Sequence, residues 1–240
     1  MRLKRVFDIV VTLLAAAVWL PVLSVAALAI LLTTGRPVLY RSRRLVSTGE
    51  PMEIVKFRTM VKNAEQLANR TTVPVTTTRF LNIPPDSPLY TRVGRFLERC
   101  GLTEIPQLLH VLRGDMSIVG NRPLPKNVMD CLVEEYPYAR DRFLSPAGLT
   151  GPAQLVGRDA LTDSERLRIE GAYCRAARSG YRLRLDFMVL LYTVLIVAHV
   201  KKSMDYNGVM AMIERHSRQR ALVPARDDVE PATESPLAFD

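Results

Sequence analysis

The sequence predicts a predominantly helical α/β protein that is associated with a membrane, with a single soluble domain after a re-entrant N-terminal helix. Three observations predict this class. An uncharged run from Ile9 to Leu32 contains Pro21 near its middle. Residues Met52 to Phe57 alternate as a half-buried strand does, and apolar residues recur at helical spacing after Thr103. The chain has 240 residues, which is enough for one core beyond the membrane segment.

The uncharged run is long enough to cross a bilayer, since about 20 apolar residues suffice. Basic residues flank both of its ends, however, and positively charged flanks tend to stay on the cytoplasmic side. Because proline lacks an N–H and disturbs the preceding turn, Pro21 is expected to break the helix and let the chain turn back. We therefore predict a re-entrant helix hairpin over residues 1–36, and a kinked single span is the alternative. The basic flanks are Arg2, Lys4, Arg5, Arg36, Arg41, Arg43 and Arg44.

The charge balance indicates an anionic partner. Lysine and arginine exceed aspartate and glutamate by nine, and in a membrane-associated chain this excess favours lipid head groups and phosphate ligands. We expect no nucleic-acid partner, because no recognisable reading motif is present. The three cysteines are widely spaced, which indicates neither a disulfide framework nor a zinc site.

The strand at Met52 to Phe57 would place Lys56 on the face opposite Phe57. Residues 61–70 are expected to form a short helix, and Thr71 to Pro88 a long loop rich in threonine and proline. The next helix is expected to begin with Thr103 as its capping residue and to end at Gly114.

Three further segments complete the chain. Thr162 to Glu165 has the form of a capping box and predicts a helix that continues to about Arg178. The apolar run Phe187 to Val200 is too short to span a membrane, and is expected to pack in the core or against the bilayer surface. The predicted units are the hairpin at 1–36, a domain at 37–200, a peripheral helix at 201–218 and a disordered tail at 219–240.

The start of the predicted helix at Thr103 is the place where a phosphate would bind, because free N–H groups and the positive end of the helix dipole meet there. Glu104 lies at the same end. A carboxylate beside a phosphate requires a metal ion such as Mg²⁺, or basic side chains, between the two groups.

Several motifs together resemble one family. They are Lys56-Phe57-Arg58-Thr59-Met60, the stretch from Glu104 to Ser117, and Gly148 to Gln154 followed by Gly157-Arg158. Over residues 2–200 the chain is similar to the bacterial sugar transferases of polyprenyl-phosphate glycan pathways, the monotopic phosphoglycosyl transferases.

The resemblance implies transfer of a sugar 1-phosphate from a nucleotide sugar, usually a UDP-sugar, to undecaprenyl phosphate, with release of UMP. This step begins the synthesis of an exopolysaccharide or another lipid-linked glycan. The resemblance also implies Mg²⁺, contact with membrane lipids and a catalytic domain on the cytoplasmic face of the inner membrane. Downstream glycosyltransferases are the expected protein partners, and the sequence leaves open whether the protein is a homodimer.

The resemblance assigns roles to individual residues. Glu104 takes the place of the catalytic, metal-binding glutamate, and Thr103 takes the place of the aspartate that attacks the sugar-bearing phosphate. Lys56 and Arg58 are expected to contact the diphosphate or the lipid phosphate, and Arg122 the phosphate or the nucleotide. The expected nucleotide-sugar pocket also includes Gln154 and Arg158.

Three positions depart from the family pattern. Thr103 replaces the aspartate, Glu98 replaces an arginine five residues earlier, and Asn121 replaces a proline. A threonine hydroxyl needs a base, whereas a carboxylate is already anionic at pH 7. Thr103 is therefore a helix cap in an enzyme of direct transfer, a nucleophile activated by Glu104, or the sign of a catalytically impaired protein that acts as a scaffold or regulator.

Overall fold

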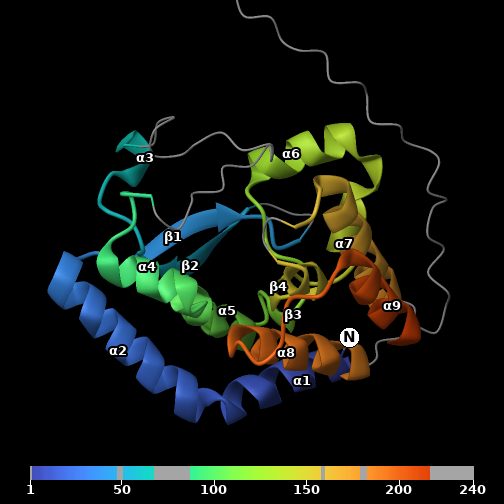
Figure 1. The fold of residues 1–240 in the computed structure, drawn as a ribbon, viewed down its shortest axis with the longest axis horizontal. Helices are drawn as coiled ribbons and strands as arrows, with labels where there is room; N and C mark the ends of the chain where they lie inside the picture. The colour runs from blue at the N-terminus through green and yellow to red at the C-terminus, as the bar shows by residue number, and fades with distance from the viewer. Residues whose placement is uncertain (1, 48–50, 68–86, 158–159, 179–182, 217–240) are drawn as a thin grey trace, which may run out of the picture.

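The computed structural model describes residues 2–47, 51–67, 87–157, 160–178 and 183–216. It shows a mostly helical α/β fold with two small sheets (Figure 1), which confirms the mostly helical α/β part of the prediction. The α-helices are α1 (Arg2–Leu14), α2 (Ala16–Thr34), α3 (Ala64–Leu67), α4 (Arg92–Arg99), α5 (Leu108–Arg113), α6 (Lys126–Glu135), α7 (Asp163–Arg178), α8 (Leu183–Val197) and α9 (Tyr206–His216). The 3₁₀ helices are η1 (Leu102–Gln107), η2 (Pro137–Phe143) and η3 (Pro152–Leu155). The strands are β1 (Leu39–Arg44), β2 (Met52–Phe57), β3 (Ser117–Val119) and β4 (Gly148–Thr150).

The N-terminal helices meet at an angle along one side of the molecule (Figure 1). The interruption lies at Ala15, whereas Pro21, the predicted break, lies inside α2. Proline removes only the bond to the carbonyl four residues earlier, that of Ala17, and the helix continues on both sides of it, so the prediction of a break at Pro21 is wrong. At the junction, the indole Nε1 of Trp19 donates to the carbonyl oxygen of Thr12 at 2.9 Å. This hydrogen bond replaces the backbone bond that the Thr12 carbonyl would accept in a continuous helix.

Several predicted elements are present. Strand β2 covers the predicted residues and pairs antiparallel with β1, and β3 pairs parallel with β4. The backbone N–H of Thr162 donates to Glu165 Oε2 at 2.9 Å, and the N–H of Glu165 donates back to Thr162 Oγ1 at 3.2 Å, so the capping box of α7 is confirmed. Gly114 ends α5 with a φ of 96°, as predicted. The predicted loop at 71–88 and the tail at 219–240 lie almost entirely or wholly outside the described residues.

The prediction that Thr103 caps a helix is wrong. The segment begins at Leu102 as a 3₁₀ helix, and Gly101 precedes it in the left-handed region with a φ of 66°. Thr103 therefore lies inside the 3₁₀ helix and not at its capping position, and its hydroxyl donates to the Glu98 carboxylate of the preceding helix. A short 3₁₀ helix has a weak dipole, so the phosphate site expected at its amino end loses that support.

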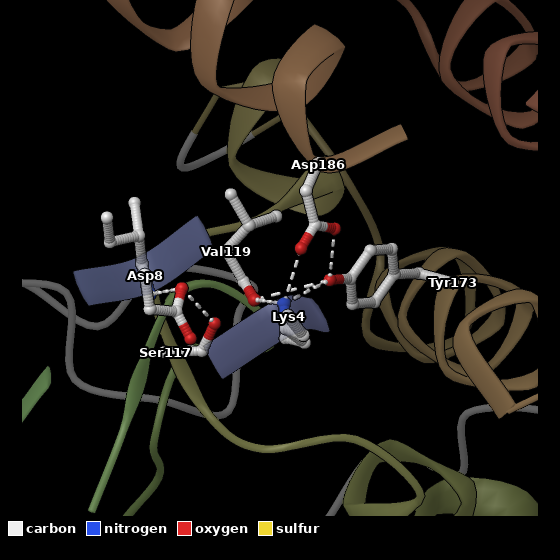
Figure 2. Close-up of polar contacts among 7 residues, drawn as sticks. Lys4, Asp8, Ser117, Val119, Tyr173 and Asp186 are labelled. Atoms are coloured by element: carbon white, nitrogen blue, oxygen red, sulfur yellow. Dashed lines mark hydrogen bonds and ion pairs between the residues drawn. The ribbon is translucent and has the colours of Figure 1, made fainter. Parts of the chain in front are cut away.

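The N-terminal helix is fixed to the core by a buried polar network (Figure 2). Lys4 Nζ on α1 forms an ion pair with Asp186 of α8 at 2.5 Å, and donates to the Val119 carbonyl at 2.7 Å. Tyr173 Oη on α7 donates to the other oxygen of Asp186 at 2.7 Å. Nearby, Asp8 accepts from Ser117 Oγ and from a backbone N–H of β3. These contacts tie α1 to three segments that are distant in the sequence.

The main core lies between β3, β4 and helices α7, α8 and α9. Val209 and Ile213 of α9 are completely buried in it. The segment 201–218, predicted as a peripheral helix, therefore contributes its helix to the core of the domain. A second cluster lies under α6 and η2, and a third joins Ala26 and Ile30 of α2 to Phe57 of β2 and Leu97 of α4.

Helix α2 is long and apolar enough to cross a membrane, and little of it is buried within the fold. Helix α1 lies next to α2, and α8 lies next to α1, along the lower edge of Figure 1. Each buries one face in the domain and exposes apolar side chains on the other. The exposed side chains are Leu3, Val6, Val10, Leu13 and Leu14 on α1, and Phe187, Leu191, Val194 and Val197 on α8. This side of the molecule is therefore suited to contact lipid.

Candidate active site

A polar pocket lies between the β1–β2 hairpin, η1 and the loop after β3. Its lining residues are Ser42, Arg44, Ile54, Lys56, Glu104, Gln107, Arg122 and Pro123. Opposite residues of an antiparallel pair point to the same face, and Ser42 pairs with Ile54 in the hairpin. The alternation of β2 therefore directs Lys56 into the pocket, while Phe57 points into the apolar cluster with α2, as the sequence predicted.

Basic side chains converge on this pocket. Burial lowers the pKa of Lys56, and the neighbouring cations Arg122 and Arg44 lower it further, while the carboxylates of Glu98 and Glu104 raise it. Burial likewise lowers the pKa of Arg44, and the positive charge of Arg122 lowers it further. Clustered cations that depress one another's pKa values are an arrangement that a bound anion stabilises.

Glu104 and Arg122 form a two-pronged ion pair at the edge of the pocket. Arg122 Nη1 donates to Glu104 Oε2 at 3.2 Å, and Nη2 donates to Oε1. Both side chains remain partly exposed. The pair fixes the orientation of the guanidinium, whose planar fork is a shape that phosphate oxygens match.

The loop that carries Arg122 is rigid because its neighbour is anchored inside the domain. Asn121 Nδ2 donates to the Arg142 carbonyl at 3.0 Å and to Cys174 Sγ at 3.1 Å. Arg142 in turn donates from Nη2 to the Arg122 carbonyl at 2.7 Å, and forms a buried ion pair with Glu170 at 3.1 Å. The asparagine that departs from the family pattern therefore has a structural role.

The hydroxyl of Thr103 donates to Glu98 Oε2 at 2.9 Å. Thr103 is buried, with 4% of its surface exposed. The structure thus gives Thr103 a different carboxylate partner from the predicted one, because Glu104 is occupied by Arg122. Two of the three departures, Thr103 and Glu98, are in direct contact.

Arg58 has a structural position outside the lining of this pocket. Its Nη2 donates to the Thr34 carbonyl at 2.8 Å and to the Gly35 carbonyl at 2.9 Å. These are carbonyl groups at the end of α2, where a helix lacks internal partners. Nη2 of Arg58 therefore caps α2, and its predicted phosphate contact stays a prediction.

Gln154, one of the predicted nucleotide-sugar residues, is also absent from the lining of the pocket. Gln154 lies on η3 and donates from Nε2 to the Leu149 carbonyl at 3.2 Å, so it stabilises the turn between β4 and η3. Arg158 lies outside the described residues. Of the predicted site residues, the pocket therefore brings together Lys56, Glu104 and Arg122.

The side chains of the pocket fit Mg²⁺ only if the substrate supplies some of its ligands. No group of three or more histidine, cysteine, aspartate or glutamate side chains that could hold a metal occurs among the described residues. Mg²⁺ commonly retains waters and binds one or two carboxylates together with substrate phosphates. Glu104, in a pocket suited to phosphate, fits that mode, with the substrate supplying the other oxygens.

Sequence reasoning missed Arg44 and Gln107 as pocket residues. The sequence alone marks Arg44 only as a basic flank of the membrane segment, because β1 is polar and mostly exposed and shows no apolar alternation. Once β2 is recognised, the basic run before it is a candidate partner strand. Gln107 lies on the segment that also carries Glu104, three positions later along a tight helix, so its side chain falls on the same face.

The amino-acid sequence is similar to those of known sugar transferases. A family model described as "Bacterial sugar transferase" matches residues 1–200. The chain is 29% identical to the uncharacterized sugar transferase EpsL of Bacillus subtilis (strain 168), over 81% of this chain and 86% of that protein. It is 31% identical to the exopolysaccharide production protein ExoY of Sinorhizobium fredii, over 80% and 83%. It is 37% identical to the UDP-glucose:undecaprenyl-phosphate glucose-1-phosphate transferase of Caulobacter vibrioides, over 68% of this chain and 57% of that longer protein.

Proposed function

Because the chain belongs to the bacterial sugar transferase family, we propose that it transfers a sugar 1-phosphate from a UDP-sugar to undecaprenyl phosphate. UMP is the second product, and the lipid-linked sugar begins an exopolysaccharide or a related glycan. Downstream glycosyltransferases remain the predicted protein partners. The relative from Caulobacter vibrioides carries this reaction in its name.

One observation supports the proposal most strongly, namely the pocket in which Arg44, Lys56 and Arg122 converge beside Glu104. A diphosphate carries charge on several oxygens and binds where cations and N–H donors surround it. Mg²⁺, when bound at Glu104 with substrate phosphates, would neutralise part of the negative charge that the transfer redistributes.

The attachment of both ends of the α1–α2 pair supports the re-entrant arrangement. The start of α1 is fixed to the domain through Lys4, and the end of α2 is fixed to it through Arg58. A helix pair that leaves and rejoins the same domain need not cross the bilayer. We therefore propose that α1 and α2 dip into the inner membrane from the cytoplasmic face, with α8 lying on the surface.

The proposal is tested by measuring UMP release from a panel of UDP-sugars, with purified protein, undecaprenyl phosphate and Mg²⁺. We expect release with at least one sugar, and dependence of continued release on the lipid phosphate. No release with any sugar would contradict the proposal. If Thr103→Asp then restored release, the protein would be the scaffold or regulator that the loss of the aspartate suggests.

A further inference from the structure

Gln107 differs from most of the polar side chains that line the pocket, because its side-chain amide is not paired. Arg44 Nε donates to Ser42 Oγ at 2.8 Å, and Arg122 donates to both carboxylate oxygens of Glu104. The amide of Gln107, in contrast, makes no hydrogen bond with the rest of the described chain. Its donor and acceptor are therefore available to a molecule that enters the pocket.

The local backbone holds the Gln107 side chain in the wall of the pocket. Gln107 is the last residue of η1, three positions after Glu104, and residues three apart in a 3₁₀ helix lie above one another. Segment η1 packs against β2, the strand that directs Lys56 into the pocket. Only 2% of the surface of Gln107 is exposed. Gln107 also precedes α5, but its side chain forms no capping bond there.

A buried amide without a partner is unfavourable for folding. It loses its hydrogen bonds to water and gains none in return, so such groups are uncommon in native structures. An apolar side chain of the same length would fill the position of Gln107 without this cost. The fold alone thus gives no reason for an amide here, whereas a ligand that pairs with it does.

The chemistry of the amide restricts what that ligand is. Nε2 of Gln107 donates and Oε1 accepts, while an ionised diphosphate offers only acceptor oxygens. A ligand that satisfies both atoms must carry a hydroxyl or N–H group close to a phosphate. In a nucleotide sugar this group is the substituent at C2 of the sugar, on the carbon next to the one that bears the phosphate. The ribose hydroxyls lie further from the diphosphate, because C5′ and C4′ intervene.

We propose that Gln107 is a specificity-determining residue that requires a hydrogen-bond donor at C2 of the sugar; this rests on the proposed function. Nε2 donates to an oxygen of the sugar-bearing phosphate. Oε1 accepts from the C2 substituent, which is a hydroxyl or the N–H of an acetamido group. A sugar without a donor at C2 leaves Oε1 buried and unpaired, and this penalty is the basis of the discrimination.

The first test removes the group from the substrate, so it does not depend on the folding of a variant. Wild-type protein, undecaprenyl phosphate and Mg²⁺ are incubated with the UDP-sugar that gives UMP release, or with its analogue lacking the C2 substituent. We expect kcat/KM for the 2-deoxy analogue to be lower by about 10- to 100-fold. Equal values for the two substrates would overturn the inference and leave the proposed function intact.

The second test removes the amide from the protein. Gln107→Met keeps the length of the side chain and loses both hydrogen-bonding groups, so kcat/KM for the parent UDP-sugar should fall by about 10- to 100-fold. In this variant the parent sugar and its 2-deoxy analogue should react within about twofold of each other. A merely structural role would not change this ratio. Gln66→Met is the matched control, since Gln66 is an exposed glutamine of α3 outside the pocket lining; it should retain the wild-type ratio.

Other outcomes overturn the inference in distinguishable ways. If Gln107→Met instead removed the discrimination against UDP-sugars that lack a ribose hydroxyl, the amide would contact the nucleotide. Because the amide makes no bond within the described part of the free protein, Gln107→Met should have a Tm no lower than that of Gln66→Met. A lower Tm with the wild-type sugar ratio retained would make Gln107 a structural residue. Absence of UMP release from wild-type protein with every sugar would refute the proposed function, and the inference with it.

Discussion

Glu104→Gln is expected to lower the turnover number for UMP release by about 10²- to 10³-fold, while the KM for the UDP-sugar does not rise. The amide keeps the size of the side chain but loses its charge, so it can no longer hold Arg122 through two charge-assisted bonds. It also removes the carboxylate that would bind Mg²⁺. The loss of a negative charge beside the diphosphate offsets the loss of this metal ligand for substrate binding, so the KM is not expected to rise.

A fall in turnover without a rise in KM distinguishes a role of Glu104 in the reaction from a role in substrate binding. Steady-state UMP release at varied UDP-sugar concentration measures both quantities. Glu53→Gln is the control for the same chemical change on the surface, because Glu53 is an exposed glutamate of β2 that pairs with the exposed Arg41. A Glu104→Gln protein with turnover within about threefold of wild type would contradict the role assigned to Glu104. A raised KM with normal turnover would mean that Glu104 acts in binding alone.

Lys4→Met is expected to lower the free energy of unfolding by about 3–5 kcal/mol. The side chains of Lys4 and Asp186 are almost completely buried, at 4% and 1% exposure. Removing the lysine leaves the Asp186 carboxylate with the Tyr173 hydroxyl but without its cation, and leaves the Val119 carbonyl with one donor fewer. Thermal unfolding in detergent, followed by circular dichroism, should show a Tm lower by roughly 10 °C.

A double variant separates lost charge balance from lost packing. Lys4→Met combined with Asp186→Leu removes both charges, so it should recover much of the stability lost in Lys4→Met alone. If Lys4→Met unfolded within about 1 kcal/mol of wild type, the network in Figure 2 would not be what holds α1 on the domain. The support for a re-entrant α1–α2 pair would then weaken, because it depends on that attachment.

The elements that the sequence predicted are those whose signals are local. The capping box at Thr162 and the glycine stop at Gly114 depend on residues a few positions apart, and both are present in the structure. The alternation in β2 also placed Lys56 correctly. Such features follow from backbone hydrogen bonding and side-chain periodicity within one segment.

The features that were missed or misplaced depend on partners elsewhere in the chain. Thr103 has the composition of a cap, but the left-handed Gly101 starts a 3₁₀ helix and brings the hydroxyl to Glu98 of α4. Arg58 has the composition of a phosphate ligand, but the end of α2 lies against it. The Lys4–Asp186 pair joins opposite ends of the chain. Hydrophobic periodicity carries no information on which polar groups will meet across such separations.

The central claim is that the diphosphate of a UDP-sugar binds between the β1–β2 hairpin and η1. A structure of the protein with an uncleavable UDP-sugar analogue tests this most directly. The account predicts phosphate oxygens within hydrogen-bond distance of Lys56 Nζ and of the Arg122 guanidinium, with Glu104 beside them. A diphosphate bound elsewhere on the protein, with Lys56 and Arg122 making no contact to it, would contradict the account.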